Sequence, residues 1–408
     1  MTRGNAKGRV AGLAPEPRTS ARVLLIAGLI LAGLNMRPAL AGVSPLLDEI
    51  MSDLALTPAA GGAITTVMVA CLGLLGPAAP ALAGRLGLDR TLLIALLILT
   101  VGIAVRSADG VTCLYVGAAI AGTAIAIMNV VMPGVVKQHF PEQVGLYTGI
   151  YVSALVLGAS TASAVMVPIE QGHGWRFAAG SAAILALAGT VLWAPQAFRR
   201  QIVPARTAHR PYRTLMRSRV TWYVAIFMGL QSATFYITLA WLPTIFRDAG
   251  IPADQAGYLL GLSNLVQVGV TLLAPMHAAR FRSQVPHVTV ATLLTTAGYV
   301  AVLIAPTTVP WLWMIILGLG QGISLALAML IITLRAPDPT SVTALSAVSQ
   351  SFGYLLAALG PFVIGILHQF SGAWTIPLLV GLAACLLQLV SGVFAGRPVH
   401  LPIRAQAD

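Results

Sequence analysis

Long apolar runs, separated by short polar segments, fill the chain from about residue 22 to residue 395. An α-helix needs roughly 20 apolar residues to cross a bilayer. Because backbone groups inside lipid must be hydrogen-bonded within their own segment, we expect each run to be a helix. The pattern predicts twelve spans, at 22–45, 59–84, 91–106, 112–136, 144–167, 177–195, 221–246, 257–279, 287–305, 309–334, 342–368 and 374–395.

Composition supports the bilayer as the solvent for most of this chain. Of 408 residues, 57% are hydrophobic and only 9% are charged, and the mean hydropathy is +0.86. A soluble protein carries about a quarter charged residues. The sequence therefore predicts an all-α membrane protein, and the lipid bilayer is its first expected partner.

The distribution of basic residues predicts the orientation of the chain. Twelve spans place both termini on one side, and 20 of the 24 Lys and Arg residues fall on that same side. Such a bias marks the cytoplasmic face. We therefore interpret the net charge of +12 as a topology signal rather than as a nucleic-acid-binding surface, and we expect a multi-pass protein of the bacterial inner membrane with cytoplasmic termini.

A polar, basic segment divides the twelve spans into six and six. This organisation predicts five regions, namely a cytoplasmic tail (1–21), a six-helix bundle (22–195), a cytoplasmic linker (196–220), a second six-helix bundle (221–395) and a cytoplasmic tail (396–408).

The two sets of six spans carry related landmarks, which indicates an internal repeat. Pro45 and Pro243 are 198 residues apart, and Trp175 and Trp374 are 199 apart. The Arg-Leu that follows Pro80 matches the Arg-Phe that follows Pro275, 195 residues later. A parallel repeat of this kind is typical of the major facilitator architecture, in which the substrate site lies between the two halves near the middle of the membrane.

Arg37 is the leading candidate for substrate binding. It lies within the first predicted span, and no Asp or Glu falls inside any span as drawn. An intramembrane charge costs about 2.5–3.5 kcal/mol on insertion scales, so it faces a cavity or a partner. A substrate anion is the favoured partner, and the alternative is a structural role at the helix break that Pro38 introduces.

Uncharged polar and aromatic side chains in other spans complete the predicted cavity. Those of the seventh span share one helical face, although packing between helices explains such groups equally well. The predicted substrate-binding set is Arg37, Asn129, Tyr151, Gln231, Phe235, Thr238, Gln267, Gln321, Gln350 and Tyr354.

The sequence offers little for other chemistry. It contains no nucleotide-binding loop, catalytic triad or metal-ligand spacing, so we expect no cofactor, no metal and no enzymatic activity. His277 and His368 lie near span ends, where an interfacial role is favoured over metal binding or a proton relay, and the three cysteines are expected to be buried apolar groups.

Four segments resemble one family of transporters. They are LNMRPALAGVSPLLDEI (34–50), NVVMPGVVKQHFP (129–141), GLQSATFY with LAWLP (229–243) and QSFGYLLAALGP (350–361). Together they resemble the CynX/NimT branch of the major facilitator superfamily, which includes cyanate and 2-nitroimidazole transporters. The resemblance implies the twelve-helix fold in two pseudo-symmetric bundles and transport of a small anion or a small polar heteroaromatic compound.

One loop departs from the wider superfamily. Between the second and third spans the wider superfamily usually carries an Asp after a Gly, followed by a basic cluster. Here residues 83–90 read AGRLGLDR, so that Asp is missing. This departure puts the usual gating salt bridge of that loop in doubt.

We therefore expect a monomeric secondary transporter that works by alternating access. Broader drug-like efflux is the alternative within transport, while a membrane sensor lacks room for a signalling domain in its longest predicted loop. A coupling proton stays open, because no carboxylate lies within a predicted span.

Overall fold

The structure is a computed structural model that describes residues 19–198, 215–399 and 401. Most of the predicted N-terminal tail, linker and C-terminal tail falls outside these residues. Within the described ranges, the chain is helical and contains no strand.

Twelve helices are long and apolar enough to cross a membrane, as predicted. They run slightly further than the sequence pattern indicated, and the short third span extends from Leu88 to Arg106. The twelve are Arg22–Asp53, Ala60–Leu86, Leu88–Arg106, Val111–His139, Pro141–His173, Trp175–Ala197, Arg219–Asp248, Gln255–Ala278, Val285–Ile304, Pro310–Arg335, Pro339–Ser371 and Thr375–Gly396.

The elements fall into two groups of six spans. The N-terminal bundle comprises α1 (Thr19–Asn35), α2 (Pro38–Ala41), η1 (Ser44–Leu46), α3 (Leu47–Asp53), α4 (Pro58–Leu75), η2 (Gly76–Ala78), α5 (Ala79–Leu86), α6 (Leu88–Arg106), α7 (Val111–His139), η3 (Pro141–Gln143), α8 (Val144–His173) and α9 (Trp175–Ala197). The C-terminal bundle comprises α11 (Arg219–Asp248), α12 (Ala253–Ala278), α13 (Val285–Ile304), α14 (Pro310–Arg335), α15 (Pro339–Ser371) and α16 (Thr375–Gly396).

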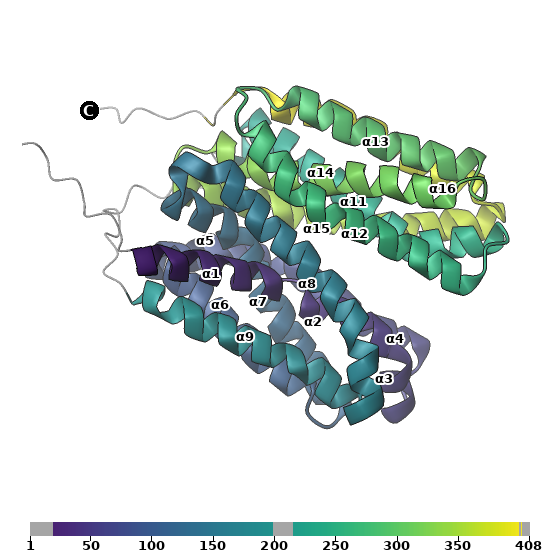
Figure 1. The fold of residues 1–408 in the computed structure, drawn as a ribbon, viewed down its shortest axis with the longest axis horizontal. Helices are drawn as coiled ribbons and strands as arrows, with labels where there is room; N and C mark the ends of the chain where they lie inside the picture. The colour runs from purple at the N-terminus through teal and green to yellow at the C-terminus, as the bar shows by residue number, and fades with distance from the viewer. Residues whose placement is uncertain (1–18, 199–214, 400, 402–408) are drawn as a thin grey trace, which may run out of the picture.

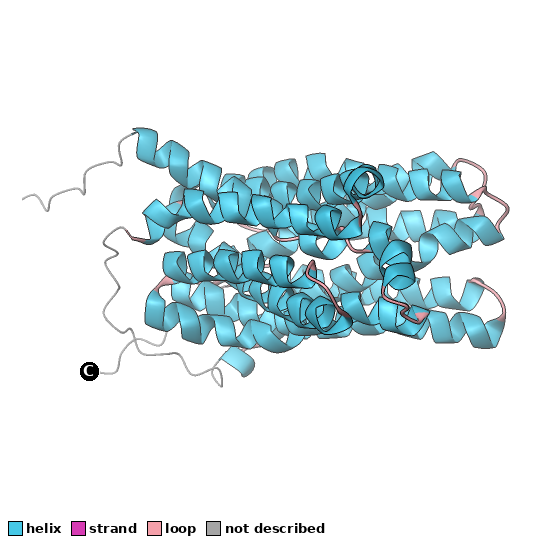
Figure 2. Ribbon diagram, turned by 90° about the horizontal axis from the view of Figure 1, so that it is seen from below, coloured by secondary structure: helices cyan, strands magenta, loops and turns pink. Residues whose placement is uncertain are grey.

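The two bundles lie side by side and diverge toward one end. Figure 1 shows α1 to α9 below and α11 to α16 above, with the ends of α3 and α4 well apart from the far end of α12. Figure 2 shows that most helices run along the long axis of the molecule. The beginning of α1 and the ends that flank the undescribed linker lie at the opposite, converging end (Figure 1).

Glycines allow the bundles to touch at the converging end. A Cβ on Gly149 of α8 would lie 2.5 Å from the Leu272 carbonyl oxygen of α12, and one on Gly145 would lie equally close to the Pro275 carbonyl oxygen. Only glycine permits backbones to approach this closely. The Ser153 hydroxyl adds a hydrogen bond to the Val268 carbonyl oxygen at 2.8 Å. The contact between α8 and α12 therefore closes one end of the space between the bundles.

The internal repeat has a structural counterpart at the diverging end. The Trp175 indole donates to the Asp53 carboxylate at 3.1 Å in the N-terminal bundle. The Trp374 indole donates to Asp248 at 2.8 Å in the C-terminal bundle. Each bond ties the end of the first span of its bundle to the beginning of the sixth, so the two matched tryptophans have the same role.

Candidate functional site

The first span is broken where the sequence places its charged residue. α1 ends at Asn35, and α2 begins at Pro38 with Arg37 as its N-cap residue. Proline has no backbone N–H to continue the α1 ladder, which explains the break at this point. The Asn35 amide stabilises the end of α1 by donating to the Leu185 carbonyl oxygen at 3.0 Å. Arg37 thus leaves the helix at a fixed point between the bundles.

Tyrosine hydroxyls surround the Arg37 guanidinium. Its Nη1 donates to the Tyr236 hydroxyl of α11 at 3.4 Å, and Tyr354 of α15 also interacts with it. Tyr151 of α8 lies close enough to Tyr354 to interact electrostatically. Arg37 forms no ion pair with a carboxylate of the described chain. The guanidinium therefore holds a positive charge among neutral groups that come from both bundles.

Close helix packing brings Tyr151 to this place. A Cβ on Gly33 of α1 would lie 2.8 Å from the Tyr151 carbonyl oxygen, and a Cβ on Gly158 of α8 would lie 2.3 Å from the Leu34 carbonyl oxygen. The two glycines let α8 lie directly against the last turn of α1, beside the break. Tyr151 is buried, and its hydroxyl has no hydrogen-bond partner among the described residues.

A second arginine binds the broken helix. Arg106, at the end of α6, is only 2% exposed, and its Nη1 donates to the Ala39 carbonyl oxygen of α2. The sequence pattern placed Arg106 at the end of its span and gave no sign of this burial. The carbonyl-binding role that was the structural alternative for Arg37 is therefore carried out by Arg106, and Arg37 makes no such bond within the described chain.

Asn129 of α7 and Gln350 of α15 meet at the interface between the bundles. The Gln350 amide nitrogen donates to the Asn129 carbonyl oxygen at 2.7 Å and to the Ser346 hydroxyl at 2.7 Å. The Asn129 amide nitrogen donates to the Ile125 carbonyl oxygen at 3.0 Å. The two side-chain oxygens, Asn129 Oδ1 and Gln350 Oε1, are buried without a hydrogen-bond partner among the described residues. Gln350 lies one turn before Tyr354, so this pair borders the Arg37 cluster.

The remaining predicted residues belong to the C-terminal bundle, and two of them, Gln321 and Thr238, bond to each other. The Gln321 amide donates to the Thr238 hydroxyl at 2.9 Å, and Thr238 is 3.2 Å from the Tyr299 hydroxyl. The Gln231 amide donates to the Ser232 hydroxyl at 2.7 Å. The contacts of Thr238 join α11 to α14 and α13, which is the packing between helices that the sequence left open as the second interpretation.

Gln267 and Phe235 complete the predicted set. Gln267 is buried in α12, where its amide lies 3.3 Å from the Asn264 side-chain oxygen. Phe235 is partly exposed and packs edge-on against Tyr236, with ring centroids 5.4 Å apart. Of the ten predicted residues, the structure gathers Arg37, Tyr151 and Tyr354 in one cluster, with Asn129, Gln350 and Phe235 next to it.

Tyr236 is the contact that the sequence analysis missed. The helical face drawn through the seventh span placed Tyr236 to one side of the predicted cavity. A repeat-based signal was available, since Tyr236 lies 199 residues after Arg37, the same offset as the matched tryptophans. In the structure, the Tyr236 hydroxyl, rather than a group of the predicted Phe235, accepts the hydrogen bond from the guanidinium.

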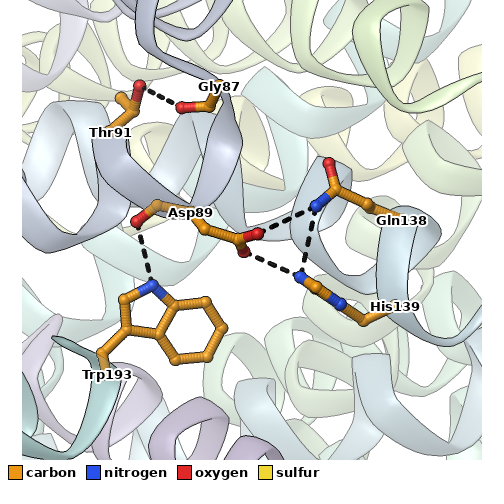
Figure 3. A network of polar contacts seen from close by, with 6 residues as sticks. All are labelled: Gly87, Asp89, Thr91, Gln138, His139 and Trp193. Carbon is orange, nitrogen blue, oxygen red and sulfur yellow. Dashed lines mark hydrogen bonds and ion pairs between the residues drawn. The ribbon is translucent and has the colours of Figure 1, made fainter. Parts of the chain in front are cut away.

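A separate polar network lies at the converging end of the N-terminal bundle. Asp89, fully buried in the first turn of α6, accepts hydrogen bonds from Gln138 at 3.0 Å and pairs with His139 at 2.7 Å (Figure 3). The Trp193 indole of α9 donates to the Asp89 carbonyl oxygen at 3.0 Å. This network joins α6, α7 and α9 within one bundle. The loop that lacks the usual Asp thus places a buried carboxylate at Asp89.

Comparison with known proteins agrees with this architecture. Residues 23–361 match the family profile described as Major Facilitator Superfamily. The chain belongs to the major facilitator superfamily. It is 36% identical over 380 residues to the uncharacterized transporter YycB of Bacillus subtilis (strain 168), which covers 92% of this chain and 94% of that one.

Two relatives from Escherichia coli (strain K12) define the branch. The 2-nitroimidazole transporter is 35% identical over 378 residues, covering 92% of this chain and 96% of its own. The cyanate transport protein CynX is 28% identical over 377 residues, covering 92% and 97%. The chain is therefore a transporter of the CynX/NimT family, and a sensor role is set aside.

Solved structures confirm the fold. The proton:xylose symporter XylE, bound to 6-bromo-6-deoxy-D-glucose, superposes with a TM-score of 0.73 at 15% identity, covering 94% of this chain and 98% of that one. With twelve candidate spans, the major facilitator protein fits a multi-pass membrane location.

Proposed function

We propose that this transporter carries a small anion or a small polar heteroaromatic compound, and that Arg37 binds its negatively charged or electron-rich group. The observation that carries the proposal is a guanidinium held between the bundles without a carboxylate partner in the described chain. A bidentate guanidinium matches carboxylate-like groups well. Of the compounds named for the two relatives, 2-nitroimidazole carries a planar nitro group with two oxygens like a carboxylate, and cyanate is a linear anion whose terminal oxygen and nitrogen can accept hydrogen bonds from the guanidinium.

The tyrosines and amides supply the rest of the proposed site. Tyr236, Tyr354 and Tyr151 offer aromatic surface and hydroxyl groups next to Arg37. The unpartnered oxygens of Asn129 and Gln350 are acceptors, so they suit a substrate N–H group once the α7–α15 contact opens. A substrate with an anionic end and an N–H group would use both features.

The arrangement of the bundles supports alternating access with this site at the centre. With the termini in the cytoplasm, as the basic residues indicate, the α8–α12 contact closes the cytoplasmic side. The diverging end (Figure 1) then faces outward. Transport requires the α8–α12 contact and the Gln350 hydrogen bond to Asn129 to break as the opposite side closes.

Uptake into liposomes that contain the purified protein tests this proposal. We expect 2-nitroimidazole, cyanate or both to enter faster than into empty liposomes, and large cationic drugs to show no protein-dependent flux. Imposed pH gradients then show whether a proton is coupled to the flux. Transport of bulky drugs alone would instead favour broad efflux and contradict the proposal.

A further inference from the structure

Arg335, at the end of α14, is a buried cation whose hydrogen-bond partners among the described residues are all neutral. It is 2% exposed. Its Nε donates to the Ala395 carbonyl oxygen at 3.0 Å, and its Nη2 donates to the Gly396 carbonyl oxygen at 2.9 Å and to the Gln284 side-chain oxygen. Its Nη1 makes no hydrogen bond to the described residues. Removing an arginine from water without a counter-charge is costly, so a partner anion would stabilise it.

Comparison of the two repeats shows that Gln284 stands where the N-terminal bundle has a carboxylate. Asp89 of the N-terminal bundle and Gln284 of the C-terminal bundle are 195 residues apart, the offset of Arg85 and Arg280. Both begin the third helix of their bundle and bond to the end of the fourth, through His139 and Arg335 respectively. The first pair contains a carboxylate (Figure 3), whereas the second contains an amide. In the described part of the C-terminal bundle, an arginine at this place thus meets an amide where the N-terminal bundle has a carboxylate.

A cavity of about 540 Å³ lies against Arg335. Among the described residues, its wall includes the exposed Arg282 and no acidic side chain, and Gln284 places it at the beginning of α13. Asp338, the carboxylate nearest in sequence to Arg335, is bonded to the Ser341 backbone nitrogen at 2.9 Å and to its hydroxyl at 2.6 Å. Two arginines and the N-cap residue of α13 line this space, and guanidinium groups favour an anion.

We propose that this cavity binds a phosphate group, with Arg335 and Arg282 as its ligands. Arginine pairs with phosphate through parallel N–H···O bonds, which a cavity lined by two arginines can provide. The residues of the wall lie at the ends of membrane spans, where lipid headgroups gather. Inorganic phosphate and the headgroup of an anionic lipid share this chemistry. The site is separate from Arg37 and does not depend on which substrate the protein carries.

Thermal unfolding of the purified full-length protein tests the site. Inorganic phosphate is compared with chloride at equal ionic strength, and phosphatidylglycerol nanodiscs are compared with phosphatidylcholine nanodiscs. Stabilisation by inorganic phosphate assigns the site to a free anion, and stabilisation by phosphatidylglycerol alone assigns it to a lipid headgroup. An unfolding temperature that responds to neither probe overturns the proposal.

Three variants connect any response to this cavity. Arg282→Gln is expected to weaken the binding of the effective probe at least tenfold. Gln284→Glu supplies the carboxylate that the N-terminal bundle has, so it should abolish the response while Arg335 stays paired. Arg280→Gln, an exposed neighbour outside the cavity wall, is the matched control and should respond like the wild type. An unchanged response in both Arg282→Gln and Gln284→Glu would place the binding elsewhere and overturn the proposal.

Discussion

Two arginines near one helix break have different surroundings and therefore different expected roles. Arg106 is buried and donates to the Ala39 carbonyl oxygen, so it stabilises the broken segment. Arg37 is partly exposed and meets only tyrosines. Hydropathy ranked Arg37 correctly as a residue at membrane depth, but it could not show the burial of Arg106, because that burial depends on the packing of α2 against the end of α6.

Replacement of Arg106 by glutamine separates these roles. Leaving a buried carbonyl oxygen without its hydrogen-bond donor lowers the free energy of unfolding by about 1–3 kcal/mol. We expect Arg106→Gln to lower the unfolding temperature while the substrate affinity of the folded fraction stays within about threefold of wild type. A large loss of affinity with unchanged stability would contradict this division.

The Tyr236 hydroxyl is expected to orient the Arg37 guanidinium. Tyr236→Phe removes one hydrogen bond and keeps the ring, so we expect the apparent KM for uptake to rise about three- to tenfold, equivalent to about 0.5–1.5 kcal/mol. Tyr223→Phe on the same helix is the control, since that ring stacks on Phe394 inside the bundle. Equal effects of both changes would argue against a role for the hydroxyl.

At the scale of helices, the closed end depends on contacts that only glycine allows. The sequence pattern predicted all twelve spans, because hydropathy is a local property of the chain. The pattern could not show that Gly149 faces Leu272 of the other bundle. Glycines that make such contacts and glycines that make none lie in similar apolar stretches of sequence. The face that a helix presents to the other bundle is set by tertiary packing.

Gly149→Ala tests the α8–α12 contact. The added Cβ would lie 2.5 Å from the Leu272 carbonyl oxygen, so the converging end should open and transport should fall at least tenfold. Gly261→Ala on α12 is the matched control, because a Cβ there meets nothing within 4 Å. Accessibility of an introduced cysteine near Arg37 to membrane-impermeant reagents, from each side, reports the change. Accessibility and uptake that match the control would exclude this contact as a gate.

At the scale of the molecule, the repeat joins fold and site. The matched tryptophans, recognised from spacing alone, make equivalent hydrogen bonds to Asp53 and Asp248. The halves differ where function is proposed, since Arg37 faces Tyr236 and Asp89 is replaced by Gln284. The internal repeat thus predicted the contacts that the two bundles share. The charged positions at which the bundles differ could be interpreted only from the folded arrangement of both bundles.

Uptake by Arg37 variants in liposomes tests the central claim most directly. Initial rates of 2-nitroimidazole and cyanate entry are compared for wild type, Arg37→Lys, Arg37→Gln and the outer-end control Arg247→Gln, at equal amounts of folded protein. We expect at least a tenfold loss in Arg37→Gln and a smaller loss in Arg37→Lys, which keeps the charge without the planar fork. Arg247→Gln should behave as wild type. Undiminished transport by Arg37→Gln would show that the substrate binds elsewhere.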